Sequence, residues 1–88
     1  MRFLRDSQVR VIKDGIGRSL IYIPAKDSIK VLNIVGTVIW EYCDGAHSIE
    51  DIVDTVTRSF EGVSREQARV DVRKFTEVLA KEGLIQRV

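Results

Sequence analysis

The sequence predicts an α+β fold in which a small antiparallel sheet is followed by three helices. Two observations lead to this prediction. In the first third of the chain, apolar residues alternate with polar ones or run together over short stretches, which is typical of strands. From Asn33 onward they recur every three or four positions, which is the period of an amphipathic helix.

Turn residues divide the first third of the chain into three short segments. Val9 and Val11 alternate with polar residues in the first segment, and the second is a continuous β-branched and aromatic run. Gly15-Ile16-Gly17 predicts a turn between them, and Pro24, which lacks an amide hydrogen, ends the second segment. We expect a three-stranded antiparallel meander with strands over about residues 8–13, 19–23 and 29–32.

Each expected helix has a capping residue at its start. Asn33, Ser48 and Ser64 carry side-chain oxygens that can accept the free amides of a first turn. Ser48 and Ser64 also have an acid or amide three residues later, as in a capping box. Glycines mark the ends, and the three helices are expected over about residues 34–43, 49–60 and 65–82.

A three-stranded sheet followed by a three-helix bundle is a winged-helix-like arrangement. Residues 84–88 alternate only weakly, so a short closing strand and a docked tail both stay open for this segment. The chain shows no linker and no internal repeat. We therefore expect residues 1–88 to form a single domain.

Composition narrows the classes of function. The chain has 88 residues, 14 Lys and Arg, 13 Asp and Glu, and a formal net charge of +1. A dedicated nucleic-acid binder usually carries a clear basic excess, so nucleic acid is not the expected partner. No stretch approaches the roughly 18–20 apolar residues of a membrane span. We expect a cytoplasmic protein that does not engage a membrane.

The residue inventory argues against catalysis. The chain has one histidine, His47, and one cysteine, Cys43, so neither a disulfide nor a Cys/His metal cluster can form within it. His47 is expected to be an exposed loop residue and Cys43 a small apolar filler on a helix. No phosphate-binding or dinucleotide motif is present. We therefore expect a binding module that is not an enzyme and holds neither a metal nor a cofactor.

One segment resembles the signature of a known family. The string Leu-Asn-Ile-Val-Gly-Thr-Val-Ile-Trp-Glu-Tyr-Cys-Asp-Gly, residues 32–45, is similar to that of PqqD-like proteins, in which a strand ending Leu-Asn leads into a helix closing with Asp-Gly. A capped second helix at 48–53 follows. The third helix and its end continue the match at Asp71-Val72, Phe75, Leu79 and Gly83-Leu84-Ile85. The resemblance covers about 55 residues.

The resemblance implies a role in the maturation of ribosomally made peptides. PqqD-like proteins bind the leader segment of a precursor peptide and present it to a modifying enzyme such as a radical SAM enzyme, a leader peptidase or a cyclase. Two positions depart from the family. Ile34-Val35 replaces a polar pair, and Pro24-Ala25 replaces the Pro-Glu of the pyrroloquinoline quinone branch. Maturation of a lasso peptide, or of a peptide modified by a radical enzyme, is therefore at least as well supported as synthesis of the quinone cofactor.

The resemblance also implies where the leader binds. In the family it adds a strand to the third strand of the sheet, in the cleft against the third helix. Exposed strand edges accept such peptides through main-chain hydrogen bonds. The residues implied are Ile29, Lys30, Val31 and Leu32 on the strand, and Val70, Arg73, Lys74 and Glu77 on the helix. Which face of the strand is buried stays open, as does the alternative that the helix charges are only solvated.

Two further alternatives remain. A small winged-helix DNA-binding regulator would read the major groove with its third helix. The outward face of that helix carries five basic and four acidic residues, which is more typical of a solvated surface: Arg65, Glu66, Arg69, Asp71, Arg73, Lys74, Glu77, Lys81 and Glu82. The apolar residues Ile34, Val35 and Cys43 leave a homodimer open.

Overall fold

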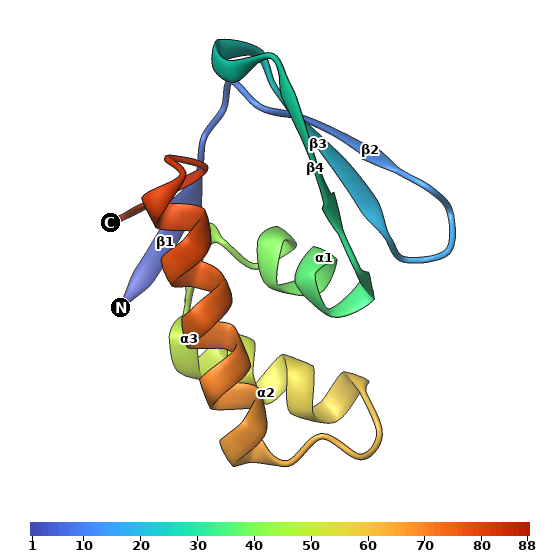
Figure 1. Cartoon of the computed structure of the whole chain (residues 1–88). Coiled ribbons are helices and arrows are strands. Elements are labelled where there is room, and N and C mark those ends of the chain that lie inside the picture. The colour runs from blue at the N-terminus through green and yellow to red at the C-terminus, as the bar shows by residue number, and fades with distance from the viewer.

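The computed structural model describes all 88 residues and has the expected α+β architecture, with two small sheets and three helices (Figure 1). The strands are β1 Arg2–Arg5, β2 Arg10–Lys13, β3 Ser19–Ile23, β4 Ser28–Leu32, β5 Asp44–Ser48 and β6 Ile85–Arg87. The helices are α1 Ile34–Glu41, α2 Ile49–Ser59 and α3 Arg65–Lys81, with a short 3-10 turn, η1, over Pro24–Lys26.

The first sheet is the expected antiparallel meander, with strand order β2-β3-β4. Leu20 pairs with Val31 and Tyr22 with Ile29, so β4 forms one edge of the sheet and β2 the other. The β2–β3 turn is held by Asp14, whose Oδ1 accepts hydrogen bonds from the amides of Ile16 and Arg18 at 2.9 and 3.0 Å.

The first strand of this sheet begins two residues later than predicted. Gln8 lies in a turn, where its amide donates to Asp6 Oδ1 at 3.0 Å, and Val9 packs against the core from outside the strand. This hydrogen bond to the Asp6 side chain holds the backbone at Gln8 in a turn, where the alternating pattern had predicted a strand.

The second sheet was not predicted. Its strand order is β5-β1-β6, which joins the two ends of the chain to the segment between α1 and α2. Residues 85–87 pair with β1, which resolves the tail as a strand. The prediction for His47 was wrong, because His47 lies in β5, half-buried, with Nδ1 2.8 Å from Asp44 Oδ2.

The helices begin at the predicted caps. The Asn33 side chain accepts the Gly36 amide at 2.7 Å, and the Ser64 hydroxyl accepts the Gln67 amide at 3.1 Å. Ser48 and Asp51 form a reciprocal capping box at the start of α2. The helices end one or two residues before the predicted ends, and none is long and apolar enough to cross a membrane.

A single apolar core joins both sheets to the helices. Ile21 and Leu32 from the first sheet and Phe3 and Ile85 from the second are all buried in it. Trp40 is the large aromatic residue of this core. In Figure 1, α1 lies between the β2–β4 sheet and the pair formed by α2 and α3. The first sheet extends from this core with both edge strands unpaired on their outer sides and with one face exposed.

Candidate functional site

β4 is an edge strand that pairs only with β3. In an antiparallel pair, alternate residues direct both N–H and C=O toward the partner strand, and the residues between them direct theirs away from it. The outward groups of β4 are therefore free to pair with another extended segment. Exposed edges of this kind are templates for strand addition.

The two faces of β4 differ sharply. The side chains of Ile29 and Val31 are 65% and 67% exposed on the outer face. Leu32 is buried, and the Lys30 ammonium lies 3.2 Å from Glu82 Oε1, beyond the end of α3. Lys30 and Leu32 therefore face the protein, which answers the question left open by the sequence.

A hollow of about 310 Å³ lies beside the end of β4, between α1 and α3. Its walls are mostly apolar, and Asp71 is the one charged group among them. The lining residues are Val31, Leu32, Asn33, Val35, Gly36, Ile39, Asp71 and Phe75. Lys30, in the middle of β4, and Lys26, just before the strand, both contact Glu82: the Lys26 ammonium donates to the Glu82 carbonyl at 3.1 Å.

Gly36 and Phe75 set the shape of this hollow. A Cβ at position 36 would lie 3.1 Å from Phe75 Cζ, which is closer than such atoms normally approach. The absence of a side chain at Gly36 lets α1 and the Phe75 ring come into contact. A glycine inside a helix costs about 1 kcal/mol relative to alanine. Its presence at position 36 is explained by this close approach.

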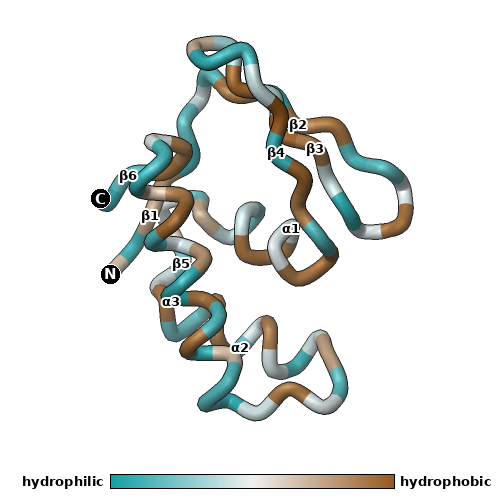
Figure 2. The backbone as a smooth tube through the Cα atoms, viewed as in Figure 1, coloured by the Kyte–Doolittle hydropathy of each residue, from teal (hydrophilic) through white to brown (hydrophobic).

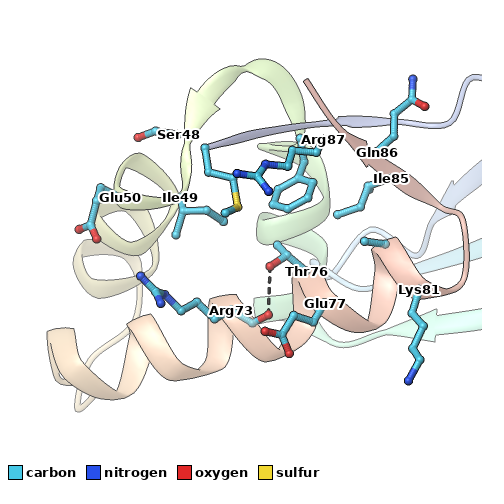
Figure 3. Close-up of a pocket in the computed structure, with 13 residues that line it drawn as sticks. Ser48, Ile49, Glu50, Arg73, Thr76, Glu77, Lys81, Ile85, Gln86 and Arg87 are labelled. Atoms are coloured by element: carbon cyan, nitrogen blue, oxygen red, sulfur yellow. Dashed lines mark hydrogen bonds between the residues drawn. The ribbon is translucent and has the colours of Figure 1, made fainter.

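The α3 residues expected at the cleft do not lie together on the side of β4. Arg73 and Glu77 line a different hollow on the other side of α3 (Figure 3). Val70 and Lys74 are exposed on the solvent side of the helix. The prediction selected residues beside the row of buried α3 residues, which is Ala68, Val72, Thr76 and Leu79. The helical period alone does not say which side of this row faces the sheet.

The structure instead brings Asp71 and Phe75 to the β4 side, one turn apart. Val78 follows three residues after Phe75 on the same side and is 45% exposed. The sequence alone placed Asp71 on the outward face of this helix. A useful signal was available in the glycine at position 36, because a glycine within a helix often marks a close neighbour.

The ion pairs of α3 bear on nucleic-acid binding. The Arg65 and Arg69 guanidinium groups both contact Glu50, and Arg65 also contacts Asp54. The hydrogen bond from Arg69 is the largest cause of the lowered pKa of the Glu50 carboxyl. The first turns of a recognition helix normally supply base and phosphate contacts. Here their arginines are engaged by α2.

The one cysteine of the chain, Cys43, is buried. Burial raises the pKa of the Cys43 thiol to about 11, so this side chain stays protonated and unreactive at neutral pH. Cys43 is a buried filler as expected, although it lies just past the end of α1. No three His, Cys, Asp or Glu side chains are grouped so that they could hold a metal ion.

Comparison with known proteins identifies relatives in sequence and fold. A family described as "Coenzyme PQQ synthesis protein D (PqqD)" matches residues 19–85. No curated protein matches the chain by sequence. The solved structure "TbiB1 in Complex with the TbiA(beta) Leader Peptide" superposes with a TM-score of 0.83 at 21% identity, over 97% of this chain and 96% of that one. A second, "Lasso peptide synthetase B1 complexed with the leader peptide", gives 0.83 at 20% identity, over 99% and 100%.

Proposed function

Because the chain belongs to the PqqD family, we propose that it binds the leader segment of a ribosomally made precursor peptide. The single observation that carries this proposal is an unpaired strand edge beside an apolar hollow, at β4. The solved structures with the same fold contain leader peptides, which supports the proposal. The chain itself carries out no reaction in this role.

The leader would bind β4 as an added strand. Its backbone would pair with the outward N–H and C=O groups of Ile29–Leu32, each hydrogen bond contributing about 0.5–1.5 kcal/mol. Such bonds depend little on side chains, so they supply affinity rather than selectivity. β2, the other edge of the sheet, has all four residues exposed, and none of them lines the hollow beside β4.

Selectivity would come from alternate side chains of the leader. Those facing inward meet the hollow bounded by Val35 and Phe75, which suits one apolar side chain, with Asp71 at its rim. Those facing outward lie beside Ile29 and Val31, where apolar cross-strand pairs are favourable. Val70 and Lys74 would border this cleft at most, whereas Arg73 and Glu77 belong to another surface.

The bound leader would be presented to the enzyme that modifies the peptide. A radical SAM enzyme, a leader peptidase and a cyclase are the candidates. Lasso-peptide maturation is the pathway class that we favour, because one of the neighbours in fold is a lasso peptide synthetase B1 complexed with a leader peptide. A recognition protein of this kind concentrates substrate at the enzyme without contributing a catalytic group.

The test compares the two edges of one sheet. Labelled N-terminal segments of the short peptides encoded beside the gene are titrated against the whole chain by fluorescence anisotropy. We expect one of them to bind with a Kd below about 100 μM, or roughly −5.5 kcal/mol. Val31→Asp on β4 is expected to weaken binding by at least about tenfold, because it puts a charge beside the added strand.

The matched control is Ile12→Asp, which changes a residue 61% exposed on the opposite edge strand. This variant is expected to bind within about twofold of the parent, since surface changes rarely alter the fold. Equal losses from the two variants, a loss confined to Ile12→Asp, or no binding by any of the encoded peptides would overturn the proposal.

A further inference from the structure

A second hollow lies on the far side of α3 from β4. It encloses about 820 Å³ between β1, β6, the start of α2 and α3 (Figure 3). Ligand sites commonly enclose about 300–1,000 Å³. The proposed leader site does not use this hollow, because the two share no lining residue.

The hollow combines an apolar floor with a charged rim. Phe3, Ile49 and Ile85 supply buried apolar surface, and Ala80 adds a small side chain on α3. Thr76 contributes little polarity, because its hydroxyl already donates to the Val72 and Arg73 carbonyls at 2.9 and 3.1 Å. The floor therefore favours an apolar side chain.

The rim carries arginines without ion-pair partners. Arg73 on α3 and Arg87 on β6 project from opposite walls (Figure 3), and neither is within ion-pair distance of a carboxylate. Of the two acids at the rim, Glu50 already pairs with Arg65 and Arg69. Glu77 and Lys81 lie one turn apart on α3 and carry opposite charges, so together they add no net charge to the rim.

We propose that this hollow binds an acidic, apolar segment of the enzyme that receives the leader-bound peptide. An apolar side chain would fill the floor, and flanking carboxylates would pair with Arg73 and Arg87, whose guanidinium groups match carboxylates in two-point hydrogen bonding. The identity of this partner rests on the proposed function, whereas the chemistry of the segment rests on the lining of the hollow.

The position of the hollow permits both partners to bind at once. Asp71 and Phe75 face the β4 side of α3, while Arg73 and Thr76 face the hollow. A leader strand on β4 and an enzyme segment in the hollow would therefore lie on opposite flanks of one helix without overlap. This arrangement would hold enzyme and substrate together on one domain of 88 residues.

The test uses two synthetic peptides and the whole chain. The probe is acetyl-Asp-Leu-Phe-Glu-amide, and the control is acetyl-Lys-Leu-Phe-Lys-amide, which keeps the apolar pair and reverses the charge. In NMR titrations followed by ¹H–¹⁵N correlation spectra, we expect the acidic peptide to shift the amide signals of Phe3, Ile49, Thr76 and Ile85 until they reach saturation. Its Kd should be below about 1 mM and at least about fivefold lower than that of the basic peptide.

Matched variants separate a local site from general attraction. Arg73→Glu, with Arg73→Gln as a milder form, is expected to weaken the acidic peptide at least about fivefold, and Lys74→Glu to stay within about twofold. Lys74 is exposed on the same helix but does not line the hollow. Lys74→Glu changes the net charge by the same amount as Arg73→Glu, so it is the matched control. Equal effects of the two reversals, equal binding of the two peptides, or no saturable shift would overturn the proposal.

The proposal that β4 binds a leader peptide can be tested independently of the inference about the hollow. A saturating leader peptide is expected to leave the affinity for the acidic peptide within about twofold, because the two sites share no residue. Binding of the acidic peptide in a chain that binds no leader would overturn the leader proposal and leave the hollow as a site for acidic segments. The reverse result would overturn only the inference about the hollow.

Discussion

The two three-stranded sheets of this protein differ in how their strands are spaced along the chain. The β2-β3-β4 sheet is built from one continuous stretch, residues 10–32, whereas the β5-β1-β6 sheet joins segments from the start, middle and end of the chain. The first leaves apolar side chains exposed along the strands, while the second buries Phe3 and Ile85 against the helices. Figure 2 shows the apolar strands of the first sheet standing apart from α2 and α3.

This difference suggests a division of labour. The second sheet closes the molecule, because it ties both chain ends to the segment between α1 and α2. The first sheet keeps an open edge and an uncovered face, which is the form of a surface that gains a strand from a partner. Stability is therefore expected to depend mainly on the second sheet and recognition on the first.

The largest predicted effect comes from truncating the Phe3 side chain, which lies in the central strand of the second sheet. Phe3 is 8% exposed in β1, and Phe3→Ala is expected to lower the free energy of unfolding by about 3–5 kcal/mol, because it leaves a cavity in a well-packed core. Urea unfolding followed by circular dichroism measures this loss. An unfolded variant agrees with the prediction. A cost below about 1 kcal/mol would show that the second sheet does not hold the fold together.

The contrast between the sheets also explains how much the sequence could predict. The first sheet was predicted because its signals are local: Pro24 and the glycines of the first turn lie directly beside the strands they separate. β1 and β5 have no such neighbours. Arg2–Arg5 shows one apolar pair between two arginines, and Asp44–Ser48 contains a single alanine, a glycine and polar residues. Their pairing is decided by packing across the core, which no short window of sequence contains.

The candidate site was predictable to the same extent. The edge position of β4 followed from the meander and from the resemblance to the PqqD family, and its residues lie where the sequence placed them. The α3 wall did not follow, because either flank of the buried stripe could have faced the sheet. The contact between Gly36 and Phe75 decides that question, and it joins residues 39 positions apart.

The next largest loss of stability is expected from removing the two N-cap side chains at the junctions between the sheets and the helices. Asn33 links β4 to α1, and Ser48 links β5 to α2. Each change to alanine is expected to cost about 1 kcal/mol, with Ser48→Ala the larger because it breaks a reciprocal capping box. Ser28→Ala, at an exposed position of β4, is the control for the loss of a hydroxyl. Losses from Asn33→Ala and Ser48→Ala no larger than this control would contradict the prediction.

Acid is expected to weaken the second sheet and the α2 cap that follows β5 more than the first sheet. The pKa of Asp44 is lowered mainly by the hydrogen bond from the Ala46 amide, and that of Asp51 mainly by the Ser48 amide. In the first sheet only Asp14 has a lowered pKa, chiefly through the Ile16 amide. A carboxyl whose pKa is lower in the folded state stabilises the fold above its unfolded pKa, near 3.8 here, and this contribution is lost as pH falls through the folded pKa.

Urea midpoints at pH 7 and at about pH 2.5 test this order. Asp44→Asn and Asp51→Asn are expected to be less stable than the parent at pH 7 and to approach its stability in acid, because protonation progressively removes the carboxylate charge from the parent as well. Asp14→Asn is expected to show a smaller difference at pH 7, since it affects only an exposed hairpin turn. A difference that stays constant between the two pH values would show that the carboxylate charge is not the cause.

The smallest effect is expected on the open sheet. Ile12 is 61% exposed on β2, where its neighbour across the strands is Leu20, and Leu20 in turn pairs with Val31 on the same outer face. Ile12→Ser removes apolar surface that the fold does not bury, so the free energy of unfolding is expected to change by less than about 0.5 kcal/mol. Unfolding in urea, measured beside Phe3→Ala, gives the comparison directly. A loss near that of Phe3→Ala would mean that this face is a structural part of the core rather than surface left available to a partner.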